Sequence, residues 1–358
     1  MDLTIKRNDF HKMISTVSGV AERHILIEAE EKLNISAVGK SDSVMAISGA
    51  DVNEKGRLCV DMSKLMNFVK SYSGEDLNLK STKAGWLNIQ GESVKIRLPG
   101  VGESEYPLTD FTELKNHITL DHNELKNAIS MTMYAIGQNE AREGLMGLNL
   151  SVTPEKVVFT AGSGPMASRY RIDHKSDFEK DILIPQRTVS EIIKVIENGS
   201  KISFSDSNIQ VESESCKYKS SLLGATFPNL NSFIDTPSQD TAKINKSDLM
   251  SYIDMINSVA SAETFPVVKF VFSNGKLEII SQNLDTGQGD GNLDCEYDGP
   301  EKSIGVNLNY LKKSISVHNH VEDEEIIFHI AGVREPIGIT SESLPNCKSI
   351  VMPVTIKW

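Results

Sequence analysis

Hydrophobic and polar positions along this chain follow two periods, and one order of elements recurs three times. Residues 181–228 begin with the apolar strand DILI, continue into a helix that starts at Pro185, and end in alternating strands. The buried face of that helix is marked by apolar residues at the 3, 4, 7 spacing, namely Val189, Ile192, Ile193 and Ile196. The Asn198-Gly199 pair is typical of a helix end. Residues 57–98 and 303–341 show the same order, which indicates an internal repeat.

A second kind of matching segment precedes each of these three. The stretches are LTIKRNDFHKMISTVSGV, HITLDHNELKNAISMTMYAI and AKINKSDLMSYIDMINSVA. Each one predicts a short strand, a polar cap residue and an amphipathic helix, and a pair of strands follows. In the last copy that strand pair turns at Asn274-Gly275, which is a strong hairpin signal.

The repeat predicts three similar α+β domains, each with two helices packed on antiparallel sheet. We expect these domains at residues 1–115, 116–239 and 240–358, because each piece then has an ordinary domain size. The two joints, SEYPLTDFTELKN and TFPNLNSFIDTPSQD, share an aromatic residue before Pro, a polar turn and a second aromatic residue. Such joints are typical of linkers that pack against their neighbours rather than of disordered spacers.

Composition indicates a globular chain. Of its 358 residues 39% are apolar and 24% charged, and no apolar run is long enough to span a bilayer. The first residues, MDLTIKRNDF, lack the apolar segment of an export signal, so we expect a cytoplasmic protein with no membrane partner. The four cysteines lie far apart, without a C-x-x-C motif, at Cys59, Cys216, Cys295 and Cys347. In a cytosol this spacing favours reduced thiols over a disulfide or a zinc site.

Charge is distributed unevenly along the chain. The net charge of −12 argues, taken alone, against nucleic acid as a partner. Ten Lys or Arg residues and seven Asp or Glu residues fall in the six expected helices, counted over 7–20, 61–72, 122–136, 186–197, 246–258 and 307–318. The helices therefore sum to +3 and the rest of the chain to −15. A basic helical layer on an acidic body can contact phosphates despite the net charge, although ordinary solvated helix faces would give the same count.

Motifs for catalysis or cofactors are absent from the sequence. G-x-x-x-x-G-K-[ST], H-E-x-x-H and G-x-S-x-G do not occur. The stretch DTGQGDGNLD has glycine at calcium-ligand positions, so a flexible hairpin tip is favoured over an EF-hand. For His318 and His320 a solvated turn is favoured over a metal site, and for Ser163 a tight turn is favoured over a nucleophile. We therefore expect a protein that is not an enzyme and needs no cofactor or metal.

Several segments resemble a known family. They are MDLTIKRNDFHKMISTVSGV, IPQRTVSEIIKVIENG, ATFPNL, KLEIISQNLDTGQGDGNLDCEYDG, IGVNLNYL and the tail IVMPV. Over essentially its whole length the chain resembles the bacterial sliding clamps, the β subunits of DNA polymerase III. The resemblance implies a homodimeric ring of two head-to-tail chains, with helices lining a hole around double-stranded DNA. It also implies DNA contact without sequence preference, and docking of the replicative polymerase and the clamp loader through a peptide motif. The alternative is a non-catalytic ring scaffold that binds protein partners without acting on DNA.

Position by position, the resemblance assigns three groups of residues. The DNA-facing group is Arg23, Lys70, Arg142, Arg187 and Lys194. The partner-peptide groove is assigned to Leu145, Ala167, Pro228, Phe233, Ile350, Val351, Met352, Pro353 and Val354. The dimer interface pairs residues 94–98 of one chain with residues 293–297 of the other, and includes Val94, Ile96, Leu98, Val259, Ala260, Leu293 and Cys295. Most groove residues, taken singly, could equally be core, but the apolar run 350–354 suits an exposed groove.

The sequence also departs from the family pattern. At residues 162–168 it has GSGPMAS, in which Pro165, Met166 and Ala167 replace a His-Arg-Leu run. In the second joint Ser232 replaces an Arg, and the tail extends to Trp358. The chain is also shorter than the family over residues 19–25, which affects the assignment of Arg23. We expect these changes to alter peptide preference, toward a bulkier apolar anchor, rather than the fold.

Overall fold

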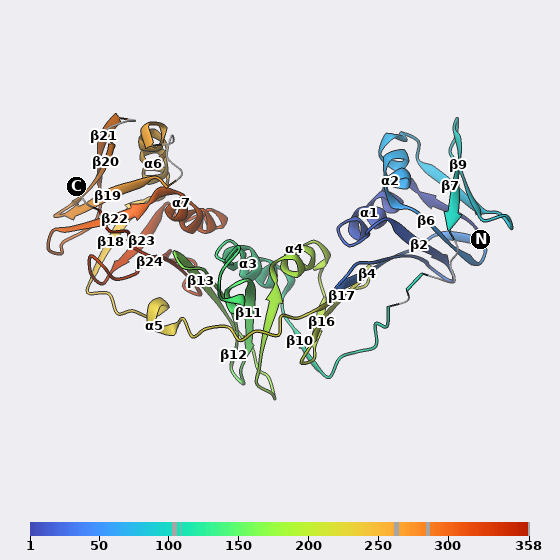
Figure 1. Ribbon diagram of the computed structural model, residues 1–358, viewed down its shortest axis with the longest axis horizontal. Coiled ribbons are helices and arrows are strands. Elements are labelled where there is room, and N and C mark those ends of the chain that lie inside the picture. The colour runs from blue at the N-terminus through green and yellow to red at the C-terminus, as the bar shows by residue number, and fades with distance from the viewer. Residues whose placement is uncertain (102–105, 108, 261–264, 284–286, 357–358) are drawn as a thin grey trace. The chain divides into compact units, whose positions relative to one another are not determined.

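The chain forms two compact units. Its structure is a computed structural model that describes residues 1–101, 106–107, 109–260, 265–283 and 287–356 (Figure 1). The first unit consists of Met1–Leu125 and Arg187–Leu222, and the second of Lys126–Gln186 and Leu223–Trp358.

One antiparallel sheet dominates the first unit. Thirteen strands pair in it within the described residues. In spatial order they are β10 (Asn116–Thr119), β15 (Lys201–Phe204), β16 (Asn208–Glu212), β17 (Cys216–Ser221), β4 (Asp42–Ser48), β3 (Leu33–Val38), β2 (His24–Ala29), β6 (Gly56–Asp61), β9 (Lys95–Val101), β8 (Trp86–Gln90), β7 (Asp76–Ser81), β1 (Asp2–Lys6) and β5 (Asp51–Glu54). Strand β17 pairs with β4, so residues from the two ends of this unit's sequence share one sheet.

The helices of the first unit bury one face each. Helix α1 (Arg7–Ser18) has a fully or nearly fully buried side made of Phe10, Met13, Ile14 and Val17. Helix α2 (Met62–Ser71) begins where the Asp61 side chain accepts a hydrogen bond from the Lys64 backbone, which satisfies one N–H of the first turn. Figure 1 shows α1 and α2 next to each other, and they are in contact. Helix α4 (Gln186–Val195) begins at the boundary of this unit.

The second unit holds two antiparallel sheets. The larger consists of β14 (Lys180–Pro185), β11 (Gly147–Val152), β12 (Lys156–Gly162), β13 (Met166–Asp173), β25 (Cys347–Val351), β24 (Ile337–Thr340), β23 (Glu325–Ile330) and β18 (Asp240–Asn245). The smaller consists of β21 (Gly287–Asp294), β20 (Lys276–Asn283), β19 (Val267–Ser273) and β22 (Lys302–Asn307). The remaining elements are α5 (Asn231–Ile234), α6 (Lys246–Ala260), α7 (Leu308–Ser316) and two 3₁₀ turns, η2 (Glu143–Leu145) and η3 (Val317–His320). Helix α3 (His122–Met133) begins in the first unit and continues into the second.

A dry core joins the two sheets of the second unit to α6 and α7. Phe270, Phe272 and Phe328 are fully buried there, and Leu249 and Leu311 bring in the two helices. Since each large apolar side chain gains about 1.5–3 kcal/mol on full burial, this core accounts for much of the unit's stability.

The predicted plan is confirmed. Strand, helix and strand follow one another six times, around α1, α2, α3, α4, α6 and α7, and the fold class is α+β with antiparallel sheets. The division into three domains stays a prediction. The strands of the expected middle domain are shared between the two units, with β10 and β15 to β17 in the first and β11 to β14 in the second.

Three local expectations can be compared with the structure. The glycine-rich stretch forms strand β21 from Gly287 onward, so Gly289 and Gly291 lie inside a strand that pairs with β20, while the expected hairpin tip at residues 285–286 lies outside the described residues. His318 does not lie in a solvated turn, because its side chain is fully buried in η3. Ser163 lies in the turn between β12 and β13, where its N–H donates to the Met166 carbonyl, as expected.

All four cysteines are free thiols. Cys59, Cys216 and Cys347 are buried, and burial raises the pKa of Cys216 and of Cys347 to about 12. Among the described residues no His, Cys, Asp and Glu side chains gather in a group that could hold a metal ion. Among the helices that the structure describes, none has the length and apolar character needed to cross a membrane.

The buried His318 makes stability depend on pH. Burial lowers its pKa from 6.5 to about 4, and its Nδ1 lies 2.8 Å from the Ser341 hydroxyl. The unfolded chain therefore binds the extra proton first, and stability is lost as pH falls from 6.5 toward 4. We expect this group to remove about 3 kcal/mol of unfolding free energy between pH 7 and pH 4. Urea unfolding at the two pH values should show a smaller loss of unfolding free energy in His318→Gln than in wild type. The exposed control His117→Gln should show the same loss as wild type. An unchanged loss in His318→Gln would contradict the prediction.

Candidate functional sites

The hairpin of β12 and β13 lies beside the last strand, β25, and part of the predicted groove meets there. Ala167 is the register partner of Ile350, and Met166 is the partner of Val351. The pairing continues past the strand end, where the Met352 N–H donates to the Pro165 carbonyl at 2.9 Å. Segments far apart in the sequence are thereby held side by side by backbone hydrogen bonds.

The linker between β17 and β18 packs on the surface that β13 and β25 form. Ile234 is fully buried and packs with Ala167 and Ile350, and Leu230 packs against the same cluster. A Cβ added to Gly162 would lie 2.4 Å from a methyl carbon of Leu230. The chain's own side chains thus fill the space beside the small residues at 162 and 167. The space beside these small residues is therefore occupied in this structure.

The nine predicted groove residues divide by exposure. Phe233 is 45% exposed, and four more are half-buried, namely Pro228, Met352, Pro353 and Val354. Ala167 and Ile350 are buried under the linker. Val351 is fully buried in the core of the second unit, so it is a core residue in this structure and offers no surface to a peptide. Lys357 and Trp358 lie outside the described residues.

Leu145 lies next to a close contact between the turn η2 and the linker. It is buried at the end of the turn η2, and its neighbour Gly144 lies tight against the linker. A Cβ on Gly144 would come within 2.2 Å of the Thr226 carbonyl oxygen and 3.3 Å of Pro228 Cδ. Glycine is therefore required for this close approach. Val354 is fixed in a similar way, because its N–H donates to the carbonyl of Gly305 at 2.8 Å.

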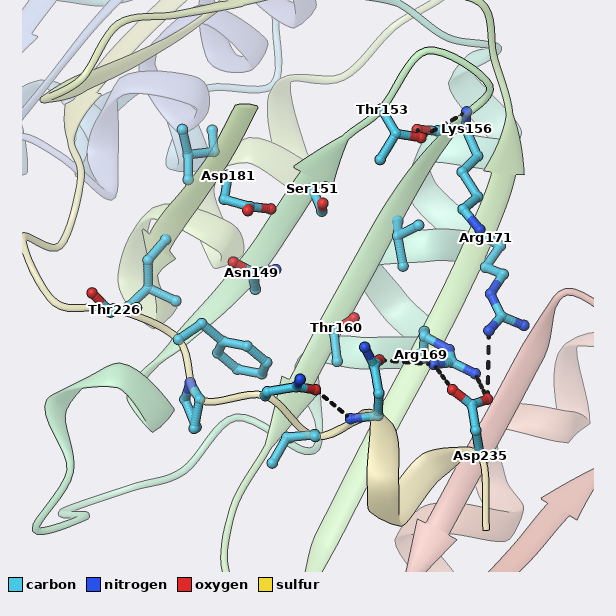
Figure 2. A pocket seen from close by; sticks show the side chains of 18 of the residues that line it. Asn149, Ser151, Thr153, Lys156, Thr160, Arg169, Arg171, Asp181, Thr226 and Asp235 are labelled. Atoms are coloured by element: carbon cyan, nitrogen blue, oxygen red, sulfur yellow. Dashed lines mark hydrogen bonds and ion pairs between the residues drawn. The ribbon is translucent and has the colours of Figure 1, made fainter. Parts of the chain in front are cut away.

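A buried arginine ties the linker to the sheet (Figure 2). The Arg169 side chain is 5% exposed and donates from both terminal nitrogens to the Asp235 carboxylate, at 2.8 Å for Nη1 to Oδ2. Its Nη1 also lies 3.3 Å from the side-chain oxygen of Asn231, and Arg171 Nη2 lies 3.5 Å from Asp235 Oδ1. The hydrogen bonds from Arg169 hold the pKa of Asp235 below its ordinary value, while burial lowers the pKa of Arg171 and of Lys348.

A polar hollow of about 680 Å³ adjoins this cluster on the same face of the sheet (Figure 2). Its lining includes Asn149, Ser151, Thr160 and Asp181 from the strands and Phe227 from the linker. One segment, the linker, thus lines the polar hollow and also carries two of the predicted groove residues, Pro228 and Phe233.

Four of the predicted DNA-facing residues lie in the first unit. Arg23 Nε lies 3.8 Å from Asp61, Lys194 Nζ lies 2.7 Å from Glu191, and Lys70 is exposed in the last turn of α2. Arg187 Nε lies 3.4 Å from Asp42. Arg142 is exposed in the second unit, just before η2.

Asp42 is a buried acid that the sequence analysis did not identify. Its side chain is 2% exposed, and its Oδ1 has no hydrogen-bond partner among the described residues. Burial raises its pKa, against the opposing effect of the Arg187 charge. Arg187 also donates to the Gly19 carbonyl at 3.2 Å, so its guanidinium is held at the end of α1.

The observed helix ends sharpen the charge asymmetry. Asp61 becomes a cap outside α2, and Glu197 falls beyond the end of α4. The six long helices then hold ten Lys or Arg residues and five Asp or Glu residues, which is a net +5 against −17 for the rest of the chain.

Two of the strands near the expected dimer interface present edges that are free among the described residues. Residues 95–98 of β9 pair only with β8 among the described residues, with Lys95 and Arg97 exposed and Ile96 and Leu98 half-buried. Strand β21 is the edge of its sheet, with four exposed polar residues at Gln288, Asp290, Asn292 and Asp294.

The expected stretch 293–297 overlaps this second edge only in part. Leu293 is buried in its own core, Cys295 packs against that core, and the Glu296 backbone is already bonded to Lys243 in both directions. Val94 is half-buried before β9, and the side chains of Val259 and Ala260 lie outside the part of the chain that the structure describes.

Comparison with known proteins matches this chain to the DNA polymerase III beta subunits. The model of the DNA polymerase III beta subunit central domain matches residues 119–229, and that of its C-terminal domain matches residues 232–355. The beta sliding clamp of Caulobacter vibrioides is 24% identical over 378 residues, covering 99% of this chain and 100% of that protein. The beta sliding clamp of Chlamydia muridarum is 23% identical over 369 residues, covering 99% of both.

Solved structures agree in fold. The DNA polymerase III subunit beta of Pseudomonas aeruginosa superposes with a TM-score of 0.91 at 18% identity, over 99% of this chain and 100% of that one. The beta subunit of Streptococcus pyogenes gives a TM-score of 0.92 at 18% identity, with the same coverage. A further Pseudomonas aeruginosa clamp structure, with a TM-score of 0.92, has griselimycin bound. With both family models matched and the fold shared from end to end, this chain belongs to the sliding clamp family of DNA polymerase III β subunits, as a divergent member.

Proposed function

We propose that this chain is a DNA sliding clamp, a ring-shaped processivity factor that encircles duplex DNA and tethers polymerase and other replication proteins. The observation that carries the proposal is the clamp fold shared over 99% of the chain with relatives named for this function. Such a protein tethers its partners to DNA, and this function requires no bond-making chemistry. The proposal includes a cytoplasmic location, with double-stranded DNA as the partner.

The charge distribution supports a sliding contact with DNA. A topological link needs only weak phosphate contacts, since strong or base-specific contacts would stop the ring from moving. The helices carry +5 while the rest of the chain carries −17, so phosphates are attracted to the helices and repelled elsewhere. We assign Lys70, Arg187 and Lys194 to the DNA path, with Arg23 and Arg142 as further contacts.

The two free edges support a head-to-tail dimer. Lys95 and Arg97 on β9 could lie opposite Asp290 and Asp294 on β21, which would pair opposite charges across the seam. We therefore propose β9 against β21, so that the seam uses Gly287–Asp294 rather than the later residues 295–297. Two different patches meet, and the ring closes because two copies complete the rotation.

The groove supports capture of an extended peptide. Its accessible apolar residues are Pro228, Phe233, Met352, Pro353 and Val354. A peptide with a Gln and a Leu-x-Phe end that buried two large side chains would gain about 3–6 kcal/mol before ordering costs, which corresponds to dissociation constants from roughly millimolar to tens of micromolar, so single-site binding is weak. Two grooves per ring would let the polymerase and the clamp loader exchange without leaving DNA.

Retention on DNA tests the function itself. With a loader present, we expect the protein to stay on nicked circular DNA and to be released when the circle is cut. Lys70→Glu with Arg187→Gln and Lys194→Gln should lower retention while the dimer persists, because phosphate contacts are lost. Lys83→Glu, an exposed control outside the helices, should behave as wild type. Release that does not depend on cutting would favour the protein-only scaffold.

Removal of one backbone N–H should disrupt the proposed dimer interface between β9 and β21. The Cys295 N–H bonds to Gly275 and the Glu296 N–H bonds to Lys243, so alternation directs the Asn292 N–H to the free edge. We expect Asn292→Pro to remove that donor and give monomers while the fold is kept, and Asn292→Thr to stay dimeric. Light scattering measures the mass. A dimeric Asn292→Pro variant would place the seam elsewhere.

The groove prediction concerns its most exposed apolar residue. Phe233→Ala should weaken binding of a fluorescein-labelled Gln and Leu-x-Phe peptide by roughly tenfold or more, because an aromatic anchor contact is lost. Val333→Ala, which also shortens an exposed apolar side chain, is the control. Equal affinities of wild type and Phe233→Ala in an anisotropy titration would contradict the groove.

A further inference from the structure

We propose that Arg169 is a positioning residue of the peptide groove: by holding both ends of α5 it fixes the linker so that Phe233 projects as a rigid wall. The inference rests on the proposed function, since the groove's role in binding partners is itself proposed. It concerns a residue that does not itself offer an exposed surface to a peptide.

The geometry spans the whole of α5. Asn231 is its first residue, and Asp235 is the residue that caps its end. Arg169 reaches both, with Nη1 at 3.3 Å from Asn231 Oδ1 and 2.8 Å from Asp235 Oδ2, and with Nη2 bonded to the other carboxylate oxygen. A planar guanidinium can make this set of bonds at once, and a lysine ammonium cannot reproduce it.

Helix α5 needs stabilising contacts from outside its own backbone. It has four residues, and its backbone bonds run from Phe233 and Ile234 to the Leu230 carbonyl and from Asp235 to the Asn231 carbonyl. One isolated turn is unstable in water, because nucleation fixes several dihedral angles for a single hydrogen bond. Burial of Ile234 against Ala167 and Ile350 supplies apolar stabilisation, and Arg169 supplies direction and register.

The position and orientation of Phe233 follow from the bonds that Arg169 makes to α5. Phe233 precedes the buried Ile234, so the turn that directs Ile234 inward leaves Phe233 outside, where it is 45% exposed. A preordered wall spares an incoming peptide the cost of ordering the linker, which is how rigidity raises affinity without adding a contact.

The charges around Asp235 explain why a variant that replaces Asp235 alone would be a poor test. Arg169 and Arg171 face it from β13, and Lys348 acts on it from β25, where it is the register partner of Arg169. Removing only Asp235 would leave three cations close together, one of them buried. The decisive variant therefore removes both charges, as Arg169→Met with Asp235→Asn.

Binding and amide exchange test the proposal together. We expect the double variant to bind the fluorescein-labelled Gln and Leu-x-Phe peptide about tenfold more weakly. The amides of Phe233, Ile234 and Asp235 should lose hydrogen-exchange protection. The control is Lys302→Met with Asp240→Asn, an ion pair of the same unit whose cation is likewise largely buried, and this variant should keep peptide affinity.

A pH profile separates positioning from general support. Weakening the pair by Arg169→Lys should move the Asp235 pKa up, so peptide affinity should be lost at a higher pH than in wild type as Asp235 protonates. Arg171→Lys should shift the profile less. Unchanged exchange at residues 233–235, or affinity of the double variant within about twofold of wild type, would overturn the positioning role. If Phe233→Ala also left affinity unchanged, the groove itself would be wrong; if Phe233→Ala alone weakened binding, the groove would stand without the Arg169 hold.

Discussion

Backbone pairing between β13 and β25 is the contact on which the rest of the candidate groove depends. It connects the strand Met166–Asp173 to Cys347–Val351 near the end of the chain, and it joins the expected middle and last domains in one sheet. Met352 extends the pairing to Pro165, so the half-buried residues that follow it are held beside the hairpin turn. Without this register, Ala167 and Ile350 would not meet, and the linker would have no floor on which to pack.

A second constraint comes from the helices, each of which must bury one face against a sheet. The buried faces are mostly apolar, and over the six long helices as a whole Lys and Arg outnumber Asp and Glu by two to one. Some of these cations are restrained by acids of the same unit. Arg187 is held by Asp42 and Lys194 by Glu191, which fixes their direction while leaving each more than half exposed. Because both acids are buried, each cation is anchored to a fixed partner inside the fold while its own side chain stays accessible to solvent.

The sequence predicts elements well here because the helix and strand periods are strong and repeated, and all six long helices occur where expected. It predicts exposure less well within short apolar runs. Residues 350–354 have no periodicity that separates Val351, which is core, from Met352, which is half-buried. His318 reads as polar, yet the fold encloses it beside Ser341. Arg169 alternates with apolar residues in β13 and so resembles a solvent-facing strand position. The residues that cover it, Asn231 and Asp235, come from a linker 62 and 66 positions away, and no local pattern records that contact.

The linker also changes what the family departures mean. Small residues at Gly162 and Ala167 suggest empty space when the sequence is compared with family members, but close packing does not leave such space open. Leu230 and Ile234 occupy it, so the lost volume on the hairpin is replaced by volume from the linker. Under the proposed function, a partner's anchor residue would meet Pro228, Phe233 and Met352 rather than the substituted hairpin. The proposal then makes the linker, held by Arg169, the segment that controls peptide preference, because Ala167 would act on the groove only through its packing with Ile234.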